Sequence, residues 1–119
     1  MLFDYGGIMS TIGFWQMAGA FNSGDYLDVD PQNMLFDYEG TPLVPLSGSI
    51  IINSSANWSI SLIPSWVDVS ATSGNAGTTV VNIYPQPNER TTQRNGSFKI
   101  TSGSNVVWVF ITQYGTFYY

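Results

Sequence analysis

The feature that most constrains the fold is a series of short runs rich in β-branched and aromatic residues, which begins after residue 41. The runs are Ser49–Asn53, Asn57–Leu62, Ser65–Val69, Thr78–Tyr84, Gly96–Thr101 and Val106–Gln113. Clusters of Ser, Asn, Gly and Pro, such as Ser73–Gly77 and Pro85–Asn88, separate them. Short runs bounded by turn residues, without a helical period, are typical of β-sandwiches. The sequence therefore predicts an all-β chain folded as an antiparallel β-sandwich.

The composition excludes several classes of function. The 119 residues include no cysteine and no histidine, which removes disulfides, thiolate or imidazole metal sites and the usual histidine bases. Three basic and eight acidic residues give a net charge of -5. So few cations cannot neutralise many phosphates, so we expect neither nucleic acid nor an anionic membrane as a partner. We also expect no enzyme activity, no cofactor and no metal.

One acidic cluster needs separate consideration. Asp25, Asp28 and Asp30 form the pattern D-x-x-D-x-D, and clustered carboxylates can bind Ca²⁺. The spacing lacks the glycine and the terminal glutamate of an EF-hand loop, so we interpret it as a solvated acidic segment. Paired carboxylates can also hydrolyse glycosides, but nothing in the pattern indicates a rigid cleft that would raise the pKa of one of them.

The N-terminal part of the chain has a different character. Residues 1–39 hold six of the eight acidic residues and no basic one. Within them, Ile8–Ala20 is apolar but is interrupted by Gln16 and by glycines, and it is shorter than the ~20 residues that span a membrane. Asp4, without any preceding Lys or Arg, also disfavours a secretory signal. We therefore expect three parts: a retained adhesive arm of about 35 residues (1–39), a sandwich domain (40–115) and an aromatic tail (116–119).

The chain contains one internal repeat. Met1–Gly7 (MLFDYGG) recurs as Met34–Gly40 (MLFDYEG), with six of seven positions identical at a spacing of 33 residues. Two copies are too few for a solenoid. Two interpretations remain open. In the first, both copies occupy similar edge or docking positions, one in its own sheet and one on a neighbouring molecule. In the second, the repeat is a local duplication or a trace of cloning.

Several motifs occur in an order that resembles a known family. They are W-S-I-S from Trp58, P-S-W-V from Pro64, S-G at Ser73, R-N-G from Arg94 and T-Q-Y-G from Thr112. Over about residues 34–115 this series is similar to the BACON domain. The resemblance implies an immunoglobulin-like sandwich of a kind associated with Bacteroidetes and with phages that infect them. It also implies that Trp58 and Trp66 pack in the core rather than stack on sugars.

The last predicted strand carries large side chains on both faces. Val107, Val109 and Ile111 share one parity and suit the core, which leaves Trp108 and Phe110 on the other face. Two outward aromatic rings form an exposed apolar patch, which we expect another surface to cover. Three covers remain open: a neighbouring protein, a glycan, or the arm of the same chain, through Phe14, Trp15 and Met17.

The resemblance, together with a single domain that carries an adhesive arm, predicts a structural virion protein. It implies an auxiliary capsid protein of a crAss-like phage that docks on the major capsid protein or on other virion proteins, with copies of itself as further partners. The alternative is a non-catalytic carbohydrate-binding module, which would be extracellular or on a cell surface. The predicted interface residues are Leu2, Phe3, Ile8, Phe14, Trp15, Met17, Trp108 and Phe110.

Overall fold

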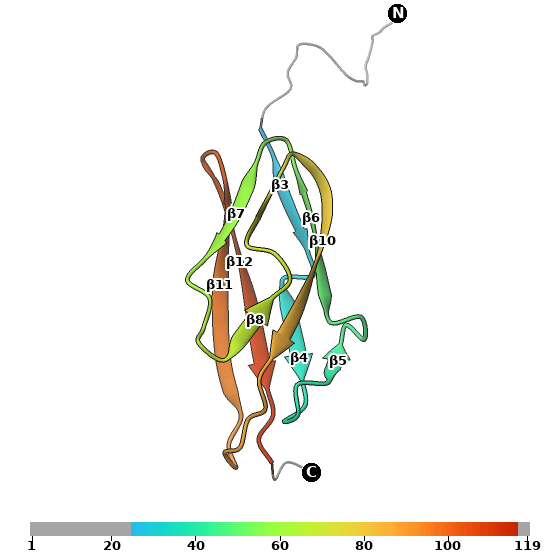
Figure 1. The fold of residues 1–119 in the computed structure, drawn as a ribbon, viewed down its shortest axis with the longest axis vertical. Coiled ribbons are helices and arrows are strands. Elements are labelled where there is room, and N and C mark those ends of the chain that lie inside the picture. The colour runs from blue at the N-terminus through green and yellow to red at the C-terminus, as the bar shows by residue number, and fades with distance from the viewer. Residues whose placement is uncertain (1–24, 117–119) are drawn as a thin grey trace, which may run out of the picture.

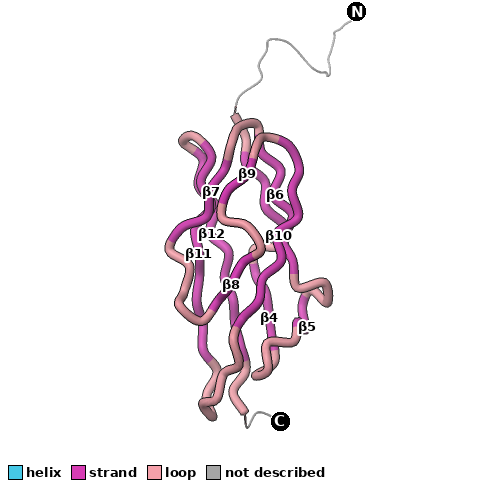
Figure 2. Tube along the Cα trace, in the orientation of Figure 1, coloured by secondary structure: helices cyan, strands magenta, loops and turns pink. Residues whose placement is uncertain are grey.

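The computed structural model describes residues 25–116, which form two β-sheets packed face to face (Figure 1). Figure 2 shows strands joined by loops over this whole range. The all-β sandwich is therefore confirmed. Within these residues, no helix is long and apolar enough to cross a membrane. Most of the expected arm, residues 1–24, and the end of the tail, residues 117–119, lie outside the described part of the chain.

Each sheet combines strands from distant parts of the chain. The strands are β3 (Leu27–Asp30), β4 (Asn33–Phe36), β5 (Pro42–Val44), β6 (Ser49–Ser54), β7 (Trp58–Ser61), β8 (Val67–Val69), β9 (Ser73–Gly74), β10 (Gly77–Pro85), β11 (Arg94–Ser102) and β12 (Asn105–Gln113). One sheet has the order β3-β6-β10-β8, and the other has the order β5-β4-β12-β11-β7-β9. All six predicted runs form strands, with ends shifted by a few residues.

The sandwich begins earlier than the boundary expected near residue 40. Leu27 and Val29 point into the core from β3, and Met34 and Phe36 do so from β4. The chain changes sheets between these two strands, at Pro31. Because their alternating apolar side chains are buried, these strands belong to the domain and not to an arm.

One strand pair departs from the expected antiparallel arrangement. β4 runs parallel to β12, with Met34 opposite Ile111. The other strand pairs of the described sheets are antiparallel. Parallel pairing needs a long connection between its partners, and a local pattern of residues does not reveal it.

The core lies between the sheets and contains the residues expected there. The side chain of Trp58 is 2% exposed, and a Cβ atom on Gly74 would lie 2.5 Å from its ring, so the ring lies directly on that backbone. Trp66 is half-buried, and the guanidinium carbon of Arg94 lies 4.2 Å from the centroid of its ring. Val109 and Ile111, whose parity predicted a core position, are fully buried, and so are Val81, Ile83, Phe98 and Ile100.

A buried amide joins three segments at one end of the sandwich. Gln113 is fully buried, and its Nε2 donates to the carbonyl oxygens of Asp37 at 3.2 Å, Tyr38 at 3.4 Å and Gln86 at 2.9 Å. Its Oε1 accepts a hydrogen bond of 2.9 Å from Nε of Arg94. The glutamine of the T-Q-Y-G motif and the arginine of the R-N-G motif therefore act together in the scaffold.

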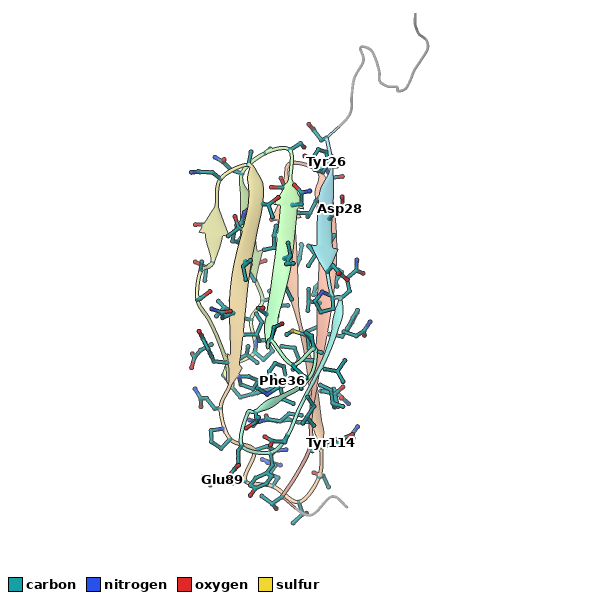
Figure 3. All side chains as sticks on the ribbon, turned by 90° about the vertical axis from the view of Figure 1, so that its right-hand side faces the viewer. Tyr26, Asp28, Phe36, Glu89 and Tyr114 are labelled. Carbon is teal, nitrogen blue, oxygen red and sulfur yellow. The ribbon has the colours of Figure 1, made fainter. Side chains whose placement is uncertain are left out.

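A second buried amide holds the loop between β10 and β11. Asn88 is fully buried, and its Nδ2 donates to the carbonyl oxygens of Thr92 and Tyr114, each at 3.0 Å. Its Oδ1 accepts a hydrogen bond of 3.2 Å from the backbone N–H of Arg90. Burial, and to a lesser degree the charge of Arg90, lower the pKa of the nearby Arg94 guanidinium from its usual value. Polar contacts thus close this end of the domain, where Figure 3 labels Glu89 and Tyr114.

Candidate functional site

The outer face of the six-stranded sheet carries a row of exposed apolar side chains along β12. Val109 and Ile111 are buried, whereas Trp108 is 39% exposed and Phe110 is 52% exposed. The predicted parity of this strand is therefore confirmed. Val106 is exposed at the next position of the same parity. We call Val106, Trp108 and Phe110 the apolar row.

The neighbours of the apolar row are mostly short and polar. On β11, Thr101 pairs with Val106, Lys99 with Trp108 and Ser97 with Phe110. On the other side, Asn33 of β4 pairs with Phe110. Since serine and threonine are small, the two aromatic rings stand out from this face, with Lys99 as the one cation among these flanking residues.

A hollow continues the apolar row toward the end of β12. It has a volume of about 370 Å³ and is lined by Asn33, Met34, Leu35, Val44, Gln93, Thr112 and Tyr114. Leu35 pairs with Thr112 on β12 and with Val44 on β5, so three adjacent strands form its floor. The lining residues combine apolar groups with two amides and two hydroxyls and include no carboxylate. Such a mixture of apolar and polar groups is common in ligand-binding sites.

The described residues offer no metal centre. No group of three or more His, Cys, Asp or Glu side chains within residues 25–116 is placed to hold an ion. Asp28 and Asp30 alternate with buried residues along β3 and are exposed on its outer side, and Asp25 is exposed just before that strand. The D-x-x-D-x-D pattern is thus spread along an extended segment.

The opposite face of the sandwich also exposes apolar side chains, but among acidic neighbours. Ile51 and Val80 are register partners on β6 and β10, and Asp30 lies beside Ile51. Tyr84 is exposed opposite Asp68. The carboxylates favour hydration of this face, so the apolar row with its hollow is the stronger candidate site.

The structure brings together two of the predicted interface residues, Trp108 and Phe110, on one face. The others, Leu2, Phe3, Ile8, Phe14, Trp15 and Met17, lie outside the described residues. Sequence reasoning missed Leu35, Val44 and Gln93. The alternation from Met34 to Phe36 was a signal that Leu35 points outward, but only the pairing of β4 with β12 places it beside the row.

The geometry defines a β-sandwich domain whose motif residues build the scaffold and whose six-stranded sheet presents an aromatic outer face. No family model and no curated protein matches the chain. Among solved structures, it is similar to a Bacteroides ovatus GH5 xyloglucanase in complex with a XXXG heptasaccharide. The match has 27% sequence identity and a TM-score of 0.64, and it covers 75% of this chain and 19% of that chain. The chain therefore corresponds to a minor part of that enzyme's length.

Proposed function

We propose that this protein is a non-catalytic docking module, an auxiliary capsid protein that covers its apolar row by binding other proteins of a phage head. The observation that carries the proposal is the exposure of Trp108 and Phe110 side by side on a face whose other groups are mostly small and polar. Contiguous exposed aromatic groups mark interaction surfaces in soluble proteins. The motif series that resembles the BACON domain, a family that also occurs in phages, supports the viral setting.

The energetics favour docking in many copies. Covering roughly 200 Å² of apolar surface at ~25 cal/mol per Å² contributes about 5 kcal/mol. The loss of translational and rotational freedom on association costs an amount of the same order. One such face therefore binds weakly by itself. A regular shell that offers many equivalent sites raises the occupancy when neighbouring copies also touch.

A matched pair of double variants tests the docking face. Trp108→Ser with Phe110→Thr removes the two rings of the apolar row, and Ile51→Thr with Val80→Ser removes two exposed apolar side chains from the opposite sheet. Both variants keep the core residues. We expect the first to fold but to be lost from purified particles, and the second to be incorporated normally. Normal incorporation of the first variant would contradict the proposal.

The arm is a second element of the proposed anchor. Because β3 begins at Leu27, a deletion of residues 1–24 removes arm residues and leaves every described strand intact. We expect this deletion to reduce incorporation into particles without lowering the free energy of unfolding of the domain. Undiminished incorporation would exclude an anchoring role for Leu2, Phe3, Ile8, Phe14, Trp15 and Met17.

One observation favours a second candidate function, the binding of glycans. The hollow beside Phe110 carries the polar groups of Asn33, Gln93 and Thr112, which suit sugar hydroxyls, and aromatic rings can stack on the sugar face. The similar solved structure belongs to an enzyme bound to a heptasaccharide. Binding on a glycan array that is lost in Trp108→Ala, with the fold intact, would support this function. If no glycan on the array binds, protein docking remains as the proposed function.

A further inference from the structure

The duplicated heptad offers an inference that does not depend on the proposed function. The second copy, residues 34–40, shows what a heptad of this sequence does in the fold. The side chains of Met34 and Phe36 are 3% and 0% exposed, so both belong to the core, and Leu35 points outward opposite Thr112. We call the position that residues 34–40 fill, beside β12, the β4 slot.

The turn that ends the β4 slot has two chemical requirements. Oδ1 of Asp37 accepts hydrogen bonds from the backbone N–H groups of Glu39 at 2.9 Å and Thr41 at 2.8 Å. Gly40 has a φ of +90°, and a Cβ atom there would collide with the carbonyl oxygen of Pro85. The slot therefore needs an aspartate at its fourth position and a glycine at its seventh.

The first heptad satisfies every one of these requirements. It supplies Met1 and Phe3 for the two buried positions, Asp4 for the turn and Gly7 for the position with positive φ. The one mismatch is Gly6, where the second copy has Glu39. The side chain of Glu39 is exposed, and this residue bonds to Asp37 through its backbone N–H, which a glycine also has. The repeat thus differs at a position where the slot tolerates either residue.

The orientation of the strands indicates which molecule would receive the first heptad. Tyr26 lies at one end of the domain, and Phe36 lies toward the other end, where Tyr114 is found (Figure 3). β3 and β4 both run from the Tyr26 end toward the Tyr114 end (Figure 1). Residues 1–24 therefore join the domain at the end remote from their own slot. A segment that left the Tyr26 end of one copy away from its own domain would meet the Tyr114 end of a second copy stacked on it in the same orientation.

The chain direction of the incoming heptad would match that of residues 34–40 in the β4 slot. Gly7 would arrive at the Tyr114 end of the neighbour, where Gly40 lies, and Met1 would reach deepest, where Met34 lies. We propose that residues 1–7 of one copy occupy the β4 slot of a second copy, parallel to its β12. Residues 8–24, when extended, can span up to roughly 55 Å between the two copies. To reach its own slot, the same heptad would have to turn back along the domain.

The exchange links copies head to tail. The recipient releases its own residues 34–40, and the incoming heptad restores nearly the same interactions because the two sequences are almost identical. The exchange therefore gains no contacts in the slot, and the native segment, which is joined to its own domain at both ends, has a high effective concentration there. We expect exchange only where copies fold together or crowd on a surface at a comparable local concentration. Head-to-tail association of this kind generates rings or open chains.

Thiol trapping tests the exchange cleanly because the chain has no cysteine. One preparation carries Leu2→Cys and another carries Thr112→Cys, and the two are refolded together at high concentration under mild oxidation. In the slot, residue 2 takes the place of Leu35, the register partner of Thr112. We expect a heterodimer joined by a disulfide between positions 2 and 112, identified by mass spectrometry of the linked peptides.

Matched variants separate exchange from random collision. Gly6→Cys mixed with Thr112→Cys has the same number of thiols, but position 6 corresponds to the exposed turn, so we expect only background cross-linking. Leu2→Cys combined with Gly7→Val keeps the thiol and blocks the turn, so we expect the heterodimer to be lost. A single chain that carries both Leu35→Cys and Thr112→Cys is the positive control, because these positions are register partners. Its intramolecular disulfide shows how far the oxidation proceeds when the two thiols lie side by side.

Two results would overturn the inference. One is a Leu2→Cys mixture that cross-links no better than the Gly6→Cys mixture. The other is a chain carrying both Leu2→Cys and Thr112→Cys that closes only within single molecules, which would assign the heptad to its own slot. Neither result bears on particle incorporation through the apolar row, because Trp108 and Phe110 lie outside the slot.

Discussion

Arg94 and Gln113 are register partners at one end of β11 and β12, and Nε of the arginine donates a hydrogen bond of 2.9 Å to Oε1 of the glutamine. On its other side the guanidinium stacks on Trp66 and donates from Nη2 to the carbonyl oxygen of Gln86 at 2.8 Å. Gln113 donates to three backbone carbonyls. The pair therefore connects the end of β11 and β12 to the loop that contains Asp37 and Tyr38 and to the loop that contains Gln86.

The first prediction follows from this pair. Gln113→Leu removes the side-chain hydrogen bonds to the carbonyls of Asp37 and Tyr38, which keep the backbone N–H groups of Gly40 and Asn88 as donors, and it leaves Nε of Arg94 without its acceptor. A neutral hydrogen bond contributes about 0.5–1.5 kcal/mol, and one to a charged group contributes about 1.5–3 kcal/mol. We expect the free energy of unfolding, measured by urea denaturation, to fall by about 2–4 kcal/mol. The matched variant Gln93→Leu, at an exposed position, should stay within about 0.5 kcal/mol of the native protein.

The second prediction is a pH dependence created at Asn88. In Asn88→Asp a carboxyl group replaces the amide that donates to two carbonyls, so its ionised form faces oxygen atoms in a buried site. Burial and these oxygens should raise the pKa of the new carboxyl in the folded state above the ~3.9 of an unfolded aspartate. The folded state then binds more protons than the unfolded state, so stability should fall as pH rises from about 4 to the raised pKa.

Thermal unfolding of Asn88→Asp between about pH 4 and about pH 8 measures this effect. The control is Asn95→Asp, because Asn95 is exposed on β11 and only accepts a hydrogen bond, from Oγ1 of Thr112 at 3.0 Å. A carboxylate retains that acceptor. We expect the control to follow the pH profile of the native protein. Parallel profiles for all three proteins would contradict the structural role assigned to Asn88.

The third prediction compares two glycines with positive φ. Gly77 has a φ of +113° with no atom within 4 Å of the place that a methyl group would take, whereas at Gly40 that methyl would meet the carbonyl oxygen of Pro85. Gly77→Ala should cost only backbone strain, about 1–2 kcal/mol. Gly40→Ala adds a clash with backbone and should cost about 1–3 kcal/mol more. Equal chemical denaturation midpoints for the two variants would contradict the close approach at Gly40.

The fourth prediction compares two phenylalanines on adjacent strands. Phe98 of β11 is fully buried between the sheets, and Phe110 of β12 lies on the outer face. Phe98→Ala should lower the free energy of unfolding by about 3–5 kcal/mol, because it opens a cavity in the core. Phe110→Ala should cost less than about 1 kcal/mol in the isolated protein. A large loss for Phe110→Ala would mean that another part of the chain covers the apolar row.

The local pattern of the sequence was enough to predict much of the candidate site. Alternation along Val106–Gln113 placed Trp108 and Phe110 on the face opposite Val109 and Ile111, because successive side chains of a strand point to opposite sides. The assignment required no knowledge of which strand lies beside β12. For the same reason, the six runs from Ser49 to Gln113 were recognised as strands.

The hollow could not be derived in this way. Leu35 and Val44 are separated from Thr112 by most of the chain, and they meet only because β4 pairs in parallel with β12 and β5 pairs with β4. The acidic character of residues 1–39, which hold six acidic residues and no basic one, indicated an arm that ended near residue 39. Their incorporation into both sheets depends on core positions that other strands leave open for Leu27, Val29, Met34 and Phe36.

The sequence by itself determined the all-β class, the places of most strands and the side of β12 on which its aromatic rings lie. Each of these follows from residue spacing within a few positions. Only the tertiary structure decided the strand order, the parallel pair β4–β12, the way Gln113 joins three segments and the neighbours of the apolar row. These depend on contacts between segments far apart in the chain, which are selected by the packing of two whole sheets and not by the pattern within any one strand.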